Sequence, residues 1–276
     1  MKKKKWLPIL VIWLVLGGVA VWGLSQFVTE QIWKSHNYIV ENPSMTVMID
    51  PGHGGYDSGA LAADGTMEKD VALALALQTG EKLHNMDPTI QIIFTRYDDN
   101  VSWPDNEAED LQARVAMAIN YGANYYLAIH CNSAEDTSAL GHFGIVREDD
   151  VISQRICQNL DNYLAAANWG PALGFRKTSD IGSIFVVDQL GIPSMLFETG
   201  FLSNPTEAMQ LRDPANQDAI STALAQAYYD SIHGLDVNVA MPAAADQSQE
   251  QAVDPAADPA ADSLADAGYT DETGLQ

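Results

Sequence analysis

The sequence is poor in basic residues. It contains 14 Lys and Arg against 37 Asp and Glu in 276 residues, which gives a formal net charge of -23. Nucleic-acid binding depends on Lys and Arg that neutralise phosphates and release counterions. No basic stripe occurs outside the extreme N-terminus. The composition therefore argues against nucleic acid as a partner, whereas 47% hydrophobic residues suit a globular core.

Cysteine is also scarce. Cys131 and Cys157 are the two cysteines of the chain, too few for a disulfide framework at this length. A bridge between them stays open, because the sequence gives no distance between their Cα atoms. Cys131 is unsuited to act as a nucleophile with His130, since neighbours along a strand point to opposite faces. We expect Cys131 to be a small buried residue.

The N-terminus has the pattern of a membrane segment. Four lysines at positions 2–5 precede an uncharged, largely apolar stretch over residues 6–27, roughly the 20 residues that cross a hydrocarbon core. We predict a cytoplasmic basic stub at 1–5, a transmembrane signal-anchor at 6–27 and a stalk at 28–44. Lys and Arg stay on the cytoplasmic side, which places the rest of the chain outside. The alternative is a cleaved signal peptide, whose apolar region is usually about 7–15 residues long.

The C-terminus is acidic and rich in Ala and Pro. From Met241 onward it contains eight acidic residues and no basic one. The acids recur every fourth residue between Asp246 and Asp266, which in a helix would bring like charges together. Pro255 and Pro259 interrupt a helix further. We predict a disordered acidic tail over residues 237–276.

Between these ends, apolar runs of strand length alternate with helical patterns. Strands alternating with helices predict a mostly parallel sheet that is covered on both faces. We therefore expect residues 45–236 to form a single α/β domain, with a twisted sheet of about six strands and helices on both faces. The expected strands are Thr46–Ile49, Ile90–Thr95, Tyr125–Ile129, Gly144–Val146, Ile184–Val187 and Ser194–Phe197. The expected helices are Lys69–Leu83, Leu111–Tyr121, Val151–Ala167 and about Gln217 to His233.

Two histidines and two glutamates occupy positions from which they can meet. His53 follows the first strand, His130 ends the third, and Glu198 ends the last. In an open α/β sheet, ligands bind outside the carboxyl ends of the strands. Glu68 begins the helix that follows a glycine-rich loop. A catalytic zinc site uses three protein ligands, so His53, Glu68 and His130 can fill these places while Glu198 transfers protons.

Each of these residues alone has a simpler interpretation. His53 could cap a turn, and His130 could be a hydrogen-bonded core residue. Glu68 could be a first-turn glutamate that the helix dipole favours. Glu198 is harder to dismiss, because a carboxylate at the end of a buried strand needs a partner. Together the four residues are far more specific than any one of them.

Five segments of the chain resemble the zinc-dependent N-acetylmuramoyl-L-alanine amidases of bacterial cell walls, the amidase type 3 family. The resemblance extends in order from about Thr46 to Leu235. The segments are Ile49–Gly55 (IDPGHGG), Glu68-Lys69, Thr95-Arg96, Ile129–Ser133 (IHCNS) and Glu198–Asn204 (ETGFLSN).

The resemblance implies zinc as the cofactor, held by His53, Glu68 and His130, with Glu198 as the catalytic glutamate and no organic cofactor. The implied substrate is peptidoglycan, cut between the lactyl group of N-acetylmuramic acid and L-alanine, and the implied location is extracytoplasmic. Arg96 and Arg114 also match family positions, either as ion-pair residues or at the substrate rim.

Two alternatives remain open from the sequence: a zinc peptidase or deacylase acting on another wall amide, and a catalytically silent protein that binds peptidoglycan. Protein partners, the oligomeric state and the choice between division, sporulation and germination are not indicated by the sequence.

Overall fold

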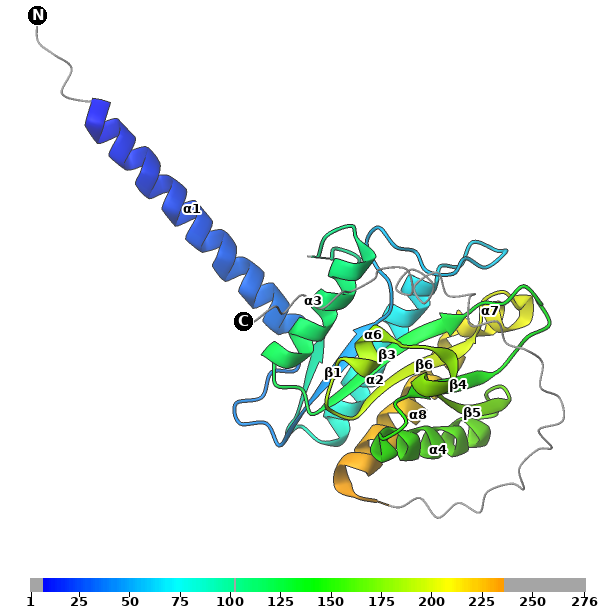
Figure 1. The fold of residues 1–276 in the computed structure, drawn as a ribbon. Helices are drawn as coiled ribbons and strands as arrows, with labels where there is room; N and C mark the ends of the chain where they lie inside the picture. Colours follow the sequence, from blue (N-terminus) through cyan, green and yellow to red (C-terminus); the bar gives the residue numbers. More distant parts are fainter. Residues whose placement is uncertain (1–6, 102, 236–276) are drawn as a thin grey trace, which may run out of the picture. The chain divides into compact units, whose positions relative to one another are not determined.

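The computed structural model describes residues 7–101 and 103–235 (Figure 1). The chain divides into two compact units, one ending at Ile39 and one beginning at Val40. The first unit contains helix α1 (Leu7–His36). The stalk predicted from residue 28 is thus helical as far as His36, because this segment contains neither glycine nor proline.

The predicted transmembrane anchor is not supported. Among the described residues, no helix is both long and apolar enough to cross a membrane. The anchor expected over residues 6–27 therefore stays without structural support. The basic stub at 1–5 and the acidic tail at 237–276 lie outside the described residues.

The second unit is built on a six-stranded sheet in the order β2-β1-β3-β6-β4-β5. The four strands β2, β1, β3 and β6 are mutually parallel, whereas β4 pairs antiparallel with β6 and parallel with β5. The predicted α/β class and mostly parallel sheet are confirmed. The strands are β1 (Met45–Pro51), β2 (Ile90–Phe94), β3 (Tyr125–Asn132), β4 (His142–Val146), β5 (Ala172–Lys177) and β6 (Ser194–Phe201).

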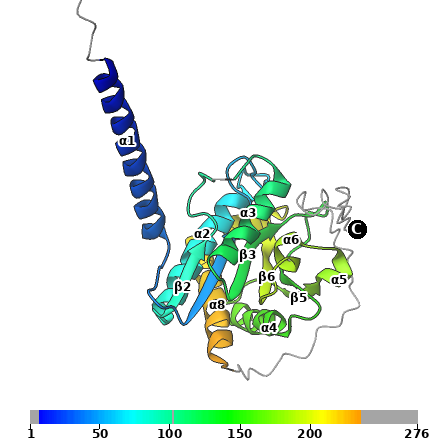
Figure 2. The same cartoon turned by 60° about the vertical axis from the view of Figure 1, so that its left-hand side comes forward.

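Helices cover both faces of this sheet (Figures 1 and 2). The chain steps from β1 to β2 in one direction and then returns past β1 to β3. Right-handed crossovers therefore place the two intervening helices on opposite faces. On one face α8 packs against α2 and α4, and on the other α3 contacts α6. The helices are α2 (Glu68–Met86), α3 (Glu107–Asn120), α4 (Val151–Ala166), α5 (Thr178–Ile181), α6 (Phe185–Asp188), α7 (Pro205–Leu211) and α8 (Pro214–His233).

Local sequence signals set the ends of α8. The Asp213 side chain accepts a hydrogen bond from the Ala215 N–H at 2.8 Å, and Pro214 occupies the first helical position. Gly234 ends the helix in the left-handed conformation, with φ 64°. The helix therefore begins three residues before the predicted Gln217, because the cap and the proline outweigh the apolar pattern as a start signal.

The core lies along the central strands. Val47, Met48 and Ile49 of β1 are fully buried, as are Tyr126 and Ala128 of β3. Strands that are covered on both faces need apolar side chains in both directions. This explains why these runs are almost continuously hydrophobic.

One predicted strand is wrong, and one strand was missed. Ile184–Val187 lies at α6 because the Asp188 carboxylate accepts hydrogen bonds from the Ile184 N–H (2.9 Å) and the Ser183 hydroxyl (2.7 Å), which closes a turn. A four-residue apolar run has no periodicity that separates strand from helix. The missed strand β5 (Ala172–Lys177) lies at the sheet edge with exposed or half-exposed residues, so it lacks an apolar run.

The α2, α4 and α8 layer yields a stability prediction. Leu224 of α8 is 0% exposed, and replacing it with Ala removes buried methyl groups and leaves a cavity. We expect Leu224→Ala to lower the free energy of unfolding by about 2–5 kcal/mol, measured by urea denaturation. The matched control is Met209→Ala on α7, where the side chain is 59% exposed and the change should stay within about 0.5 kcal/mol. Equal effects at both positions would contradict this packing.

Candidate active site

His53 stands in a tight loop directly after β1. It adopts a left-handed backbone conformation with φ 57°, followed by Gly54 at 123° and Gly55 at 59°. Its side chain is buried, and Nδ1 lies 2.6 Å from Oδ2 of Asp57. A carboxylate only accepts hydrogen bonds, so Nδ1 carries the hydrogen. The lone pair of neutral His53 is therefore on Nε2.

Glu68 reaches the same place from the start of α2. Its buried Oε1 lies 3.1 Å from Nε2 of His53 and 3.0 Å from Nδ1 of His130. The same oxygen accepts a hydrogen bond from the Cys131 N–H at 2.8 Å, and Oε2 accepts one from the Ala60 N–H at 2.9 Å. These contacts fix the carboxylate between the two imidazoles.

Gly59 makes this close approach possible. A Cβ atom there would lie 2.6 Å from Cδ2 of His53 and 2.7 Å from Oε2 of Glu68, and its φ is +61°. Both the space and the backbone conformation require glycine. The glycine-rich loop predicted from the sequence thus brings the start of α2 against the His53 loop.

His130 and Glu198 are neighbours across the sheet. The two residues are register partners on the parallel strands β3 and β6, so their side chains project from the same face. Both are almost fully buried, with exposures of 8% and 5%. The imidazole rings of His130 and His53 lie edge to face with their centroids 4.8 Å apart.

The donor atoms of His53, Glu68 and His130 are arranged as a possible metal site. One ligand atom from each residue lies within 4.8 Å of the others. The Nε2 lone pair of His53 faces a Glu68 carboxylate oxygen at 3.1 Å, an arrangement that needs a proton or a cation between the two atoms. Two imidazoles and a carboxylate are suitable zinc ligands, and the Asp57–His53 contact is the support that metal-bound histidines use. The residues present therefore fit a zinc ion.

The carboxylates around His53 set its protonation. Burial lowers the pKa of His53, but Glu68 and Asp57 outweigh burial and raise this pKa well above 6.5. Burial raises the pKa of Glu68, but His53 and His130 outweigh it and bring that pKa well below its usual value. Without a metal, the site thus favours a proton between His53 and Glu68.

A buried ion pair fixes the loop that carries His53. Arg114 of α3 contacts Asp50 of β1 at 2.5 Å and Asp110 at 2.6 Å. It also donates hydrogen bonds to the carbonyl oxygens of Pro51 (3.0 Å) and His53 (2.8 Å). Burial lowers the pKa of Arg114, but Asp50 and Asp110 outweigh it and raise this pKa above its usual range. Arg114 is therefore charged and positions the His53 backbone.

Arg96 supports the same loop through backbone carbonyl oxygens. Its guanidinium donates to the carbonyl oxygens of Pro51 (3.1 Å), Gly52 (2.8 Å) and Lys69 (2.8 Å). Burial and the charge of Arg114 lower its pKa to about 10, so Arg96 stays protonated at neutral pH. Of the two roles left open by the sequence, Arg114 takes the ion-pair one, whereas Arg96 is structural through its bonds to carbonyl oxygens.

One further histidine and the two cysteines lie apart from the possible metal site. His142 is fully buried at the start of β4, with Nε2 3.3 Å from Asp161 of α4, on the opposite face of the sheet from Glu198. Cys131 and Cys157 are both free and buried, so the possible disulfide between them is absent. The burial raises the pKa of the Cys131 thiol well above its usual value, which disfavours a thiolate nucleophile.

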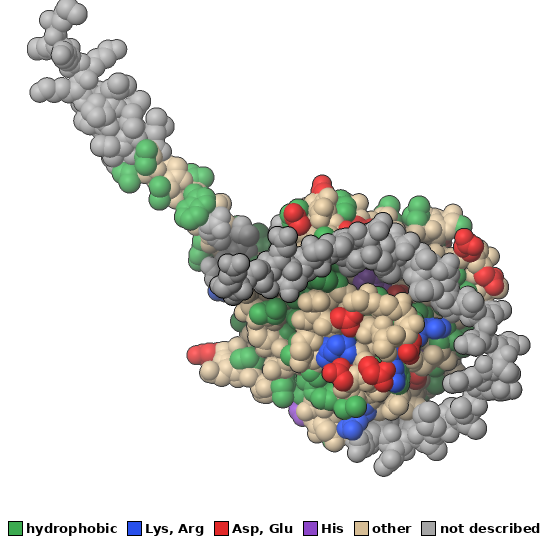
Figure 3. All heavy atoms as spheres, in the orientation of Figure 1, with side chains coloured by type: hydrophobic (Ala, Val, Ile, Leu, Met, Phe, Trp, Pro, Cys, Tyr) green, Lys and Arg blue, Asp and Glu red, His purple; other side chains and the backbone are tan. Residues whose placement is uncertain are grey.

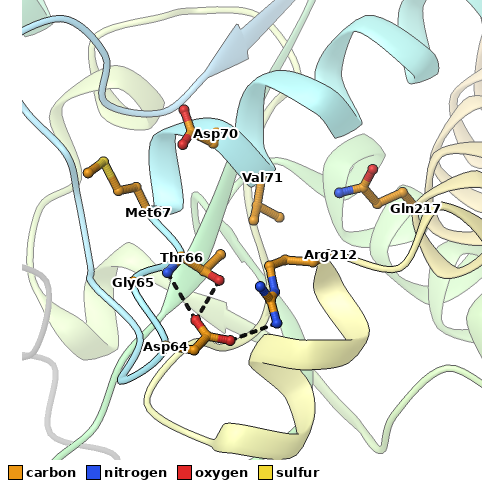
Figure 4. A pocket seen from close by; sticks show the side chains of 8 residues that line it. All are labelled: Asp64, Gly65, Thr66, Met67, Asp70, Val71, Arg212 and Gln217. Atoms are coloured by element: carbon orange, nitrogen blue, oxygen red, sulfur yellow. Dashed lines mark hydrogen bonds and ion pairs between the residues drawn. The ribbon is translucent and has the colours of Figure 1, made fainter.

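A surface pocket lies beside the segment that leads into Glu68 (Figure 4). Its volume is about 300 Å³, and none of the four candidate site residues lines it. Arg212 pairs with Asp64 at 2.8 Å across the pocket, and Asp64 accepts hydrogen bonds from the Thr66 N–H and hydroxyl. At this pocket, the ion pair between Asp64 and Arg212 joins the loop that precedes α2 to the C-terminal end of α7.

Asp57 is the site residue that sequence reasoning missed. Its signal was its spacing, four residues after His53 in a loop that turns back on itself through the Gly54–Asp57 bridge. An acidic residue at this distance from a candidate histidine ligand can reach the second ring nitrogen. The structure makes that contact at 2.6 Å.

The fold and the site define an α/β domain with two histidines and a glutamate arranged to hold a metal, and with a further carboxylate beside them. Residues 47–230 match the N-acetylmuramoyl-L-alanine amidase family, and the chain belongs to this family. It is therefore an enzyme, a peptidoglycan amidase. The resemblance noted in the sequence is confirmed, and the silent binding protein is disfavoured.

Individual relatives agree with this assignment. The chain is 29% identical over 234 residues to the germination-specific N-acetylmuramoyl-L-alanine amidase of Bacillus subtilis strain 168, covering 81% of this chain and 92% of that protein. The CwlD amidase from Clostridioides difficile, solved in complex with the GerS lipoprotein, superposes with a TM-score of 0.62 at 28% identity, covering 69% of this chain and all of that one. The catalytic domain of CwlV from Bacillus (Paenibacillus) polymyxa var. colistinus gives 0.60 at 28% identity, covering 68% and 98%.

The Asp57–His53 contact predicts an effect on metal affinity. Asp57→Asn keeps the shape but loses the charge that orients the imidazole and makes it a better ligand. We expect zinc affinity to fall about 10- to 100-fold, measured by competition with a chromogenic chelator. Asp136→Asn is the control, since Asp136 bonds only within its own exposed turn, to Ser138. An unchanged affinity in Asp57→Asn would exclude this supporting role.

The raised pKa of His53 predicts how zinc binding depends on pH. In the metal-free protein, the protonated form of His53 stabilises the folded state. This stabilisation is complete below about pH 6.5 and is lost as the pH rises through the raised pKa of His53 in the folded protein. Zinc requires the unprotonated ring. The increase in Tm on adding zinc should therefore grow from about pH 6 to about pH 9, measured by thermal unfolding. His53→Gln should abolish most of the increase, and an increase that shrinks with pH would contradict the prediction.

Proposed function

We propose that this chain is a zinc-dependent N-acetylmuramoyl-L-alanine amidase, with His53, Glu68 and His130 as the zinc ligands and Glu198 as the catalytic residue. The convergence of the three donor groups within 4.8 Å carries the proposal. The bond cut is the amide between the lactyl group of N-acetylmuramic acid and the L-alanine of the stem peptide, as the family name implies.

The side chains of the site have different roles in the proposed reaction. Zinc at such a site supplies a Lewis acid and lowers the pKa of water to about 7. Glu198 takes a proton from the attacking water and passes it to the leaving nitrogen of L-alanine. Its place beside His130 on the adjacent strand suits this transfer. Asp57, Arg96 and Arg114 keep the His53 loop in position.

The substrate implies where the domain works. Peptidoglycan lies outside the cytoplasmic membrane, so we place the action of the catalytic domain there. The C. difficile relative was solved with a lipoprotein bound, and this supports a test for an accessory lipoprotein. A zinc peptidase acting elsewhere in the wall remains an outcome that product analysis can separate.

Substitution of Glu198 tests the catalytic proposal. Glu198→Gln keeps the size of the side chain but cannot take up a proton. We expect the rate of peptidoglycan cleavage to fall about 10²- to 10⁴-fold while zinc stays bound. The rate is measured by mass spectrometry of digests made with the zinc-loaded full chain, and the zinc content by metal analysis.

The products and a control decide the interpretation. Glu81→Gln, at an exposed position of α2, should retain the activity of the unchanged protein. Intact stem peptides with a free L-alanine amine support the amidase, whereas new amines within the stem indicate a peptidase. Full activity of Glu198→Gln would remove Glu198 from the mechanism.

A further inference from the structure

Arg176 of β5 lies two strands from Glu198, and no ion pair with an acidic side chain of the described residues balances its charge. Its guanidinium stands over the Phe143 ring of β4, with Cζ 5.2 Å from the ring centroid. Its Nε is buried and donates no hydrogen bond. Buried donors are nearly always paired, so this nitrogen calls for a partner that is not among the described residues.

The strand register places Arg176 on the same face as Glu198. Phe143 is the antiparallel partner of Glu198, and Ile145 is the parallel partner of Arg176. Phe143 and Ile145 are two residues apart, so they share a face. Glu198, the Phe143 ring and the Arg176 guanidinium therefore lie in sequence across three neighbouring strands, beginning beside His130.

Most other cationic side chains of the described domain have acidic or carbonyl partners, among them Lys69, Lys82, Arg96 and Arg212. Arg114 pairs with Asp50, and Arg147 donates to the Val187 and Ile192 carbonyls. At the surface, basic side chains lie beside acidic ones (Figure 3). The ion pair between Lys177 and Glu148, at 2.7 Å, is one such contact in the structure. In a chain of net charge -23, Arg176 differs from these cations, because it stands over a ring and no ion pair joins it to an acidic side chain among residues 7–101 and 103–235.

We propose that Arg176 is a specificity-determining residue that binds a free carboxylate of the stem peptide. The inference rests on the proposed function, because it takes the stem peptide as the ligand. A guanidinium over an aromatic ring is still able to form two parallel hydrogen bonds to a carboxylate. The unpaired Nε marks Arg176 as a guanidinium whose hydrogen-bonding capacity the described residues do not fill.

The spacing indicates which carboxylates can reach Arg176. Neighbouring strands are about 4.8 Å apart, so β5 lies roughly 10 Å from β6. An extended peptide advances about 3.3 Å per residue. The guanidinium leans back over Phe143 of the intervening strand, so a carboxylate on the second or third stem residue fits this distance from the scissile amide.

Amidated substrates test the proposal with the zinc-loaded full chain. The probes are muramoyl tripeptides with all carboxylates free, with a carboxamide at the second residue, or with a carboxamide at the third. We expect amidation at one position to lower kcat/KM of the unchanged protein about 10- to 100-fold. Arg176→Gln should cleave all three probes at the same reduced rate, and Arg176→Lys should retain part of the discrimination.

A control separates charge recognition from folding. Lys177→Gln removes the neighbouring charge, which is paired with Glu148, and should discriminate as the unchanged protein does. Equal cleavage of the three probes by the unchanged protein would overturn the proposal. Arg176→Gln that still discriminates would also overturn it.

Binding keeps this test independent of the chemistry assigned to Glu198. Calorimetry of the three tripeptides with zinc-loaded Glu198→Gln, with and without Arg176→Gln, reads the same discrimination without turnover. If the three tripeptides bind with different affinities but the unchanged protein cleaves none of them, the result would support the role of Arg176 and overturn the amidase mechanism. If the unchanged protein cleaves the three tripeptides equally well, the result would support the amidase mechanism and overturn the role of Arg176.

Discussion

The buried ion pair between Asp50 and Arg114 is the interaction on which the site depends. Asp50 lies on β1 and Arg114 on α3, and both side chains are nearly inaccessible to solvent. Thr95 and Tyr126 donate their hydroxyl hydrogens to the same carboxylate. Breaking such a pair leaves an uncompensated buried charge, at a cost of about 3–5 kcal/mol. The pair and these two hydroxyls therefore connect α3 with β1, with β3 and with the residue that follows β2, next to the His53 loop.

The Asp50–Arg114 pair also links the stability of the fold to the position of a proposed zinc ligand. Arg114 uses its remaining donors on the carbonyl oxygens of Pro51 and His53, so the charge that stabilises the core also fixes the backbone of a proposed zinc ligand. His53 has a left-handed backbone, a conformation that a non-glycine residue adopts at a cost. Arg114 on its carbonyl oxygen, Arg96 on the preceding carbonyl oxygen of Gly52 and the Asp57 carboxylate on its ring hold it there. A site held in this way can keep its ligands in place before a metal binds.

The remaining half of the site is fixed by the sheet. His130 and Glu198 are register partners at the carboxyl ends of two parallel strands, a position where open α/β sheets bind their ligands. The antiparallel strand β4 continues the same surface beyond Glu198 and carries Phe143 with Arg176 above it. The reacting groups and the proposed recognition of the stem peptide thus share one face of one sheet.

Local sequence patterns were enough to predict the α/β class, most of the strands and the four candidate residues. These follow from local patterns, since His53, His130 and Glu198 end apolar runs and Glu68 begins a helix. Other features became visible in the folded chain alone. These are the hydrogen bond from His53 to Asp57, the structural roles of Arg96 and Arg114, the edge strand β5 and the position of Arg176. The contacts of Arg114 and Arg176 join residues that are far apart in the chain, or on strands whose order is not sequential. Their geometry therefore depends on register and crossover hand, which a local pattern does not contain.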